Sequence, residues 1–225
     1  MNSPAKINAG IVRRTLAAMT ATIIANFARL VTGVQPRWLG CAPGDKLRVY
    51  FPNHCSHADF VLVWSSLPAQ LRERTRPVAG SDYWDKGGLR GFVIRDVFNA
   101  VLIDREARTR EVDPIAIMQA ALDEGNSLIL FPEGTRNMTD ERLLPFKSGI
   151  FHLASRRPEV EFVPVWIENL NRVLPKGEIL PVPLLCTVNF GQPLRLAPGE
   201  SKNDFVQRAR SALLELAAVC HPHEQ

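Results

Sequence analysis

Short apolar runs alternate with longer stretches of helical pattern through most of this 225-residue sequence. The runs are rich in valine, isoleucine and leucine, and SLILF (127–131) is the clearest of them. Apolar strands separated by helices are typical of a parallel sheet that is buried on both faces. The sequence therefore predicts an α/β fold with a largely parallel central sheet flanked by helices.

The predicted strands cover residues 47–51, 76–80, 99–104, 127–131, 161–167 and 184–190. The predicted helices cover residues 59–67, 83–95, 112–124, 148–156 and 203–219. Pro114 suits the first turn of one helix and Gly125 suits its end, while Ser201 or Asn203 can cap the last helix. A chain of 225 residues can bury one sizeable core, so we expect one main domain with an appendage.

The first 40 residues differ from the rest of the chain in charge. They contain no acidic side chain and five basic ones, which are Lys6, Arg13, Arg14, Arg29 and Arg37. The whole chain has 27 basic and 23 acidic residues, so the remainder is nearly neutral. Such asymmetry indicates an anionic partner. Nucleic acid is excluded because the basic excess lies in an apolar segment without interleaved aromatic residues, which leaves a membrane surface.

An apolar run, TLAAMTATIIANFA (15–28), lies between the arginines of this segment. A transmembrane helix needs about 20 such residues, and threonines dilute the run too much for a signal peptide. A helix at the membrane interface fits better, and packing of the same stripe on the protein's own core is the alternative. We expect residues 1–40 to form this segment and residues 41–225 the main domain. The apolar stripe consists of Leu16, Met19, Ile23, Phe27 and Leu30.

Three polar clusters follow predicted strands. NHCSHAD (53–59) follows Tyr50 and Phe51, IDR (103–105) follows one apolar run, and PEGTR (132–136) follows another. In parallel sheets, binding and catalytic sites lie just beyond the carboxyl ends of the strands. The sequence therefore predicts that the three clusters belong to one site.

His54 and Asp59 lie five residues apart, across a predicted strand-to-helix turn. A carboxylate bonded to one imidazole nitrogen leaves the other as a base that can take a proton from a hydroxyl. No G-x-S-x-G nucleophile motif occurs, so we expect direct attack by a substrate hydroxyl. A metal site is disfavoured, because there is neither an H-E-x-x-H motif nor a cluster with ligand spacing.

The other two clusters supply positive charge. Arg105 and Arg136 each follow a predicted strand, and Lys147 comes eleven residues after Arg136. Pro132 and Gly134 predict a tight turn directly after the strand. Three cations at one edge of a sheet indicate a phosphate-bearing substrate.

In this order, NHCSHADF, VLIDR, FPEGTR with FKSG, and VPVWI resemble the four sequence blocks of the glycerolipid acyltransferase family, over residues 45–170. That family includes the bacterial lysophosphatidic-acid acyltransferases. The resemblance implies that His54 is the general base and Asp59 its orienting carboxylate. It implies an acceptor-binding site formed by Arg105, Glu133, Gly134, Thr135, Arg136 and Lys147. Gly149 matches the family's later basic block, and Pro164 matches a block linked to the acyl donor.

The resemblance also implies a glycerol-3-phosphate acyltransferase-like domain and an activity. A fatty acyl group would move from acyl-CoA or acyl-ACP to a lysophospholipid, with 1-acyl-glycerol-3-phosphate giving phosphatidic acid. No cofactor beyond the acyl thioester is expected, and the expected location is the cytoplasmic face of the inner membrane, peripheral or monotopic. Two alternatives stay open: another lyso-lipid acceptor, for example an amino-acid-containing lipid, and a non-catalytic membrane-binding protein on the same fold. Asn137 stands where a serine is common in the family.

Overall fold

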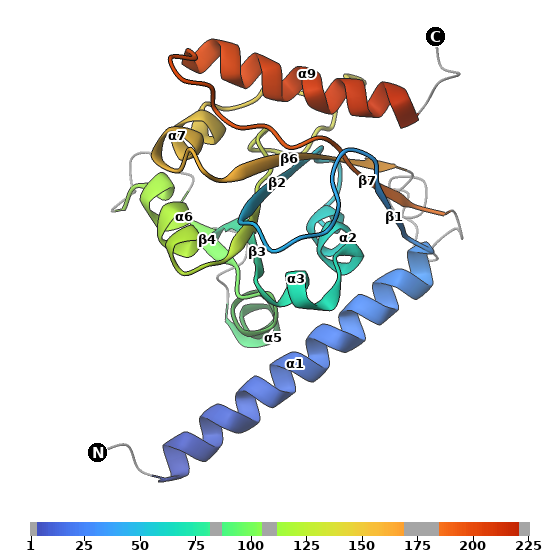
Figure 1. Ribbon diagram of the computed structural model, residues 1–225. Coiled ribbons are helices and arrows are strands. Elements are labelled where there is room, and N and C mark those ends of the chain that lie inside the picture. Colours follow the sequence, from blue (N-terminus) through green and yellow to red (C-terminus); the bar gives the residue numbers. More distant parts are fainter. Residues whose placement is uncertain (1–3, 82–86, 105–111, 169–184, 221–225) are drawn as a thin grey trace.

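The computed structural model describes residues 4–81, 87–104, 112–168 and 185–220. Within these residues the chain forms one seven-stranded sheet with helices on both faces (Figure 1). The strand order is β1-β7-β6-β2-β5-β3-β4. In chain order the strands are β1 (Gln35–Trp38), β2 (Arg48–Pro52), β3 (Thr75–Gly80), β4 (Val101–Ile103), β5 (Ser127–Ile129), β6 (Glu161–Glu168) and β7 (Thr187–Phe190).

Five neighbouring strands, β6, β2, β5, β3 and β4, pair in parallel. β7 pairs antiparallel with β6, and β1 pairs parallel with β7 at the edge of the sheet. The predicted α/β fold with a largely parallel sheet is therefore confirmed. No sequence pattern predicted β1, which lies within the first 40 residues. The division of the chain at residue 40 stays a prediction, but residues 35–38 of the first part belong to the sheet.

Helices cover both faces of the sheet, so its central strands are buried on both sides. All five residues of β2 and all eight of β6 are buried. α6, α7 and α9 pack on one face over Phe51 and Phe162, and α2, α3 and η1 pack on the other over Tyr50 and Val163. The helices are α1 (Pro4–Thr32), α2 (Asp59–Ser66), α3 (Ala69–Glu73), α5 (Gly88–Phe92), the π-helical turn η1 (Val93–Val97), α6 (Pro114–Asp123), α7 (Gly149–Arg156) and α9 (Lys202–Cys220).

The helix ends follow the signals in the sequence. Asp113 caps α6 by accepting a hydrogen bond from the Ile115 N–H at 3.0 Å, with Pro114 in the first turn. Gly125, at φ +82°, ends this helix. Ser201 caps α9, where its Oγ accepts from the Asp204 N–H at 3.3 Å. Residues 83–86 of the helix expected at 83–95 lie outside the described residues, and α5 and η1 form from Gly88 onward.

α1 packs on the main domain through small residues and two arginines. Ala17 and Ala25 are buried, and the Arg29 Nε donates to the backbone oxygen of Ser65 at 2.8 Å. Near the other end, Arg13 forms an ion pair with Asp96 of η1 at 2.7 Å. Figure 1 shows the helix running beneath the domain, on the side of α3 and α5.

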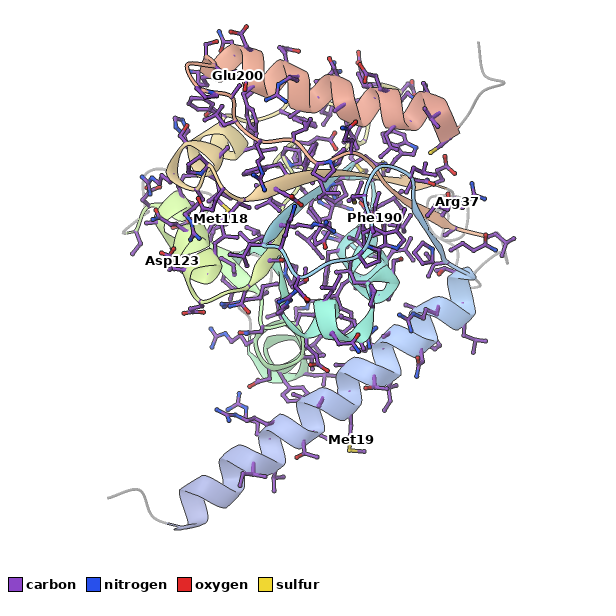
Figure 2. All side chains as sticks on the ribbon, in the orientation of Figure 1. Met19, Arg37, Met118, Asp123, Phe190 and Glu200 are labelled. Atoms are coloured by element: carbon purple, nitrogen blue, oxygen red, sulfur yellow. The ribbon has the colours of Figure 1, made fainter. Side chains whose placement is uncertain are left out.

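The apolar stripe of α1 points away from the domain. Its five residues are 53% to 82% exposed, and Met19 projects on the side away from the sheet (Figure 2). The alternative that this stripe packs on the protein's own core is therefore wrong. Residues 10–32 form a helix that is long and apolar enough to cross a membrane, judged by length and composition.

A buried ion cluster joins the amino ends of β2 and β6. Glu161 accepts hydrogen bonds from Lys46 at 2.8 Å and from the Arg48 Nε at 3.2 Å, and both Glu161 and Arg48 are buried. Burial would raise the pKa of Glu161, but the hydrogen bonds from Lys46 and Arg48 lower it below the ordinary value of 4.5.

We expect Glu161→Ala to lower the free energy of unfolding by about 3–5 kcal/mol, because Arg48 then stays buried without its partner. Since the native pKa is lowered, the contribution of Glu161 to stability is full above pH 4.5 and is lost as the pH falls through the native pKa. Urea denaturation of both proteins at pH 7 and at decreasing pH measures this. A stability difference that stays constant as the pH falls would contradict it.

Candidate active site

A cavity of about 800 Å³ lies beyond the carboxyl ends of the parallel strands. One part of its wall is polar and contains His54, Thr135, Arg136 and Lys147. Another part is apolar and contains Val78, Ile94, Ile103, Ile115 and Met118. The prediction that the clusters after β2 and β5 share one site is therefore confirmed in its geometry, and Asp104 brings the cluster after β4 to the same cavity.

His54 is held in one orientation by Asp59, the first residue of α2. The His54 Nδ1 lies 2.9 Å from the Asp59 Oδ2, and the same oxygen accepts from the backbone N–H groups of Cys55 at 2.7 Å and Ser56 at 2.8 Å. Asp59 is 1% exposed, and the start of a helix favours its negative charge. An ionised carboxylate only accepts, so Nδ1 carries the hydrogen and Nε2 is left to take a proton.

Phe131, in the segment directly after β5, supports the imidazole. Its ring stacks on the His54 ring with the centroids 4.0 Å apart and the planes 28° from parallel. Sequence reasoning missed this residue. The signal was available, since Phe131 is the aromatic residue directly before the PEGTR turn.

Glu133 lies in the turn expected to bind the acceptor, but its carboxylate is occupied within the protein. Its Oε1 accepts from the His54 N–H at 2.8 Å and its Oε2 from the Leu144 N–H at 2.9 Å. Burial raises its pKa, and the two backbone hydrogen bonds oppose that shift. Glu133 is 1% exposed and is not among the residues that line the cavity. Its geometry is that of a residue that holds two loops together.

Arg136 and Lys147 bring two positive charges into the cavity. Within the part of the chain that the structure describes, neither side chain has a hydrogen bond or ion pair. Gly134, at φ +70°, makes room for the lysine, because a Cβ there would lie 3.2 Å from the Lys147 Cγ. Cations without a carboxylate partner suit an anionic ligand.

The remaining predicted residues have different outcomes. Arg105 lies outside the described residues. Thr135 and Gly149 line the cavity, whereas Pro164 is buried in the middle of β6 beside Phe51 of β2. Among the described residues, no group of three histidine, cysteine, aspartate or glutamate side chains could hold a metal ion. The expectation that no metal takes part stays a prediction.

Comparison with known proteins places this site in a family. Residues 42–168, more than half of the chain, match the family model described as Acyltransferase. The chain belongs to the acyltransferase family. Its four blocks lie entirely within the matched region, so the resemblance noted in the sequence is confirmed.

Curated members of the acyltransferase family include named relatives of this chain. The 1-acyl-sn-glycerol-3-phosphate acyltransferase of Cocos nucifera is 28% identical over 189 residues, which is 79% of this chain and 58% of that protein. The protein of the same name from Limnanthes douglasii is 27% identical over 76% of this chain and 59% of its own length. The Haemophilus influenzae protein of that name is 31% identical over 47% of this chain and 42% of its own. The chain thus spans less than two thirds of these relatives.

A solved structure of the acyltransferase family shares the fold. The crystal structure of the 1-acyl-sn-glycerophosphate (LPA) acyltransferase PlsC from Thermotoga maritima superposes with a TM-score of 0.70. The match covers 93% of this chain and 83% of that one, at 20% sequence identity. It supports the architecture described above.

Proposed function

We propose that this protein transfers a fatty acyl group from an acyl thioester, on coenzyme A or acyl carrier protein, to the free hydroxyl of a lysophospholipid. The proposed acceptor is 1-acyl-glycerol-3-phosphate and the product is phosphatidic acid, as in phospholipid biosynthesis. The observation that carries the proposal is the His54–Asp59 pair in a cavity that also has an apolar wall and two cations. The names of the relatives support the choice of acceptor.

The proposed mechanism is a single displacement with His54 as the base. His54 Nε2 takes the proton of the acceptor hydroxyl while that oxygen attacks the thioester carbonyl and forms a tetrahedral intermediate. The intermediate then collapses, the carbon–sulfur bond breaks, and the imidazolium returns the proton to the leaving thiolate. The products are an ester and a free thiol. Arg136 and Lys147 hold the acceptor phosphate and thereby position its hydroxyl.

The direct test is thioester consumption by the purified protein in lipid vesicles. Lysophosphatidic acid is the acceptor and an acyl-coenzyme A the donor, and an acyl-ACP donor is run in parallel. Formation of phosphatidic acid with release of an equal amount of thiol is the expected result. Turnover only with another lyso-lipid would show that this lipid, and not lysophosphatidic acid, is the acceptor. No transfer with any donor or acceptor would favour the non-catalytic membrane-binding alternative.

We expect Arg136→Ala and Lys147→Ala each to lower kcat/KM for lysophosphatidic acid by about 10- to 100-fold, because each removes a charged hydrogen bond worth about 1.5–3 kcal/mol. The loss should be much smaller with a monoacylglycerol acceptor, which has no phosphate. Arg208→Ala is the control, because it removes an arginine that pairs with Glu200 near the start of α9 and does not line the cavity. It should leave kcat/KM unchanged. An equal loss with both acceptors would contradict a phosphate-binding role.

We also propose that α1 attaches the enzyme to the membrane surface, on the cytoplasmic face of the inner membrane. Its small-residue face is fixed to α2, so a helix lying in the interface preserves the observed packing. The opposite face is the exposed stripe, which such a helix buries in the boundary of the acyl chains. Arg14, which is exposed near the start of the helix, suits anionic lipid head groups.

We expect the double variant Ile23→Glu and Phe27→Glu to bind anionic vesicles at least ~100-fold more weakly, because each side chain contributes about 1.5–3 kcal/mol on burial. Thr22→Glu adds a charge at an exposed position on the flank of α1, outside the stripe, and should weaken binding much less. Sedimentation with vesicles measures binding, and thermal unfolding checks the fold. Unchanged binding of the double variant would rule out the stripe as the attachment site.

A further inference from the structure

The catalytic histidine follows a strand whose own backbone pairing stops early. β2 ends at Pro52, which has no N–H to donate, whereas its neighbour β6 continues to Glu168. On the other side, β5 ends at Ile129. The backbone at His54 therefore leaves the sheet at a point where regular strand pairing no longer fixes it.

Asn53 takes over the pairing on the β6 side. Its Nδ2 donates to the backbone oxygen of Ile167 at 3.2 Å, and its Oδ1 accepts from the Ile167 N–H at 2.8 Å. The side-chain amide thus satisfies both backbone groups of Ile167 beyond the point where β2 has ended. Asn53 is 6% exposed and is absent from the lining of the cavity, so substrate contact does not explain it.

The segment after β5 holds the same stretch from the other side. Glu133 accepts the His54 N–H, and the Asn137 N–H donates to the His54 backbone oxygen at 2.7 Å. The second oxygen of Glu133 accepts the Leu144 N–H, three residues before Lys147. One buried carboxylate therefore connects the loop of the base to the loop of a cavity cation.

We propose that Asn53 and Glu133 are positioning residues, which together clamp the backbone of His54 between β6 and the segment after β5. This proposal rests on the proposed function, in which His54 is the base. The clamp complements Asp59, because Asp59 fixes the ring while Asn53 and Glu133 fix the backbone that carries it. It assigns Glu133 to the alignment of His54 and not to contact with the acceptor.

Two near-isosteric variants test the clamp. Asn53→Asp keeps the acceptor for the Ile167 N–H but sets a carboxylate oxygen against the Ile167 oxygen. Glu133→Gln keeps the shape but can accept only one of the two backbone N–H groups through its single oxygen. Leu213→Ala is the control for lost stability, since Leu213 is buried in α9 and does not line the cavity.

The first measurement is hydrogen exchange of peptides that contain the His54 amide. Exchange should be faster in both variants than in the wild type and in Leu213→Ala. The second is steady-state kinetics with the acceptor that the wild type uses. Misplacement of the base should lower kcat by about 10- to 100-fold in both variants. In Asn53→Asp, whose lost bond does not reach the loop of Lys147, the acceptor KM should stay within about twofold.

Three results would overturn the clamp. They are unchanged exchange at His54 in both variants, a raised acceptor KM with kcat intact, and an equal loss of kcat in Leu213→Ala at a similar thermal midpoint. If the wild type transfers no acyl group to any acceptor, the proposed function fails instead. The exchange data then decide by themselves whether the clamp exists.

Discussion

Replacement of His54 by alanine will lower kcat for acyl transfer by at least about 100-fold, because general base catalysis contributes about 10²–10⁴-fold. The acceptor hydroxyl then loses the imidazole that Asp59 orients and that can take its proton. The Asp59 carboxylate keeps its two backbone donors, so we expect the fold to persist. Single-turnover release of thiol, compared with the wild type at pH 7, measures the change.

His54→Gln is the matched variant for this experiment. Glutamine can still donate a hydrogen bond towards Asp59, but its amide cannot take a proton from the hydroxyl. We therefore expect it to be as slow as the alanine variant. If either variant keeps wild-type kcat while its thermal midpoint is unchanged, His54 is not the base, and the proposed mechanism falls.

The second large effect is expected for Asp59→Asn, which should lower kcat by about 10²–10⁴-fold, by analogy with the carboxylate of other histidine–aspartate pairs. A single oxygen of Asp59 accepts three hydrogen bonds, from His54, Cys55 and Ser56. An asparagine amide is uncharged, so its oxygen accepts these hydrogen bonds more weakly and stabilises the imidazolium less. If its NH₂ group faces Nδ1, the imidazole takes the other tautomer. The pH dependence of kcat, together with thermal unfolding, measures both consequences.

Asp59→Ala separates catalysis from stability. It leaves the partly buried N–H groups of Cys55 and Ser56 without this acceptor, at a cost of about 1 kcal/mol each. Its thermal midpoint should therefore fall further than that of Asp59→Asn, while kcat falls to a similar level. A kcat that follows the thermal midpoint across the two variants would show that Asp59 acts only on the fold.

The candidate site was predictable where local sequence carries the chemistry. His54 and Asp59 are five residues apart, and a strand-to-helix turn suffices to bring them into contact. Arg136 and Lys147 were predictable because both lie near a turn that Pro132 and Gly134 impose. Phe131 and Asn53 were missed, because their roles depend on the neighbouring strands and not on adjacent residues. The contact of Glu133 with Leu144 likewise depends on how a later loop folds back.

The buried parallel strands of the fold were also predictable from local sequence, but the edge strand β1 was not. Buried parallel strands need apolar side chains on both faces, and this requirement is visible in β2, β5 and β6. β1 was missed because QPRW (35–38) has neither alternation nor an apolar run. It becomes a strand by pairing with β7, a partner about 150 residues later in the chain.

The sequence by itself determined the family, the α/β class and the pairing of a base with its carboxylate, because each depends on residue types at short and regular spacing. It could not decide whether the stripe of α1 faces the core or a membrane, since both surroundings require the same apolar periodicity. Only the tertiary structure decided that the stripe is exposed. It also decided that Glu133 bonds to the backbone of two loops, because long-range packing and burial determine which groups a side chain can reach.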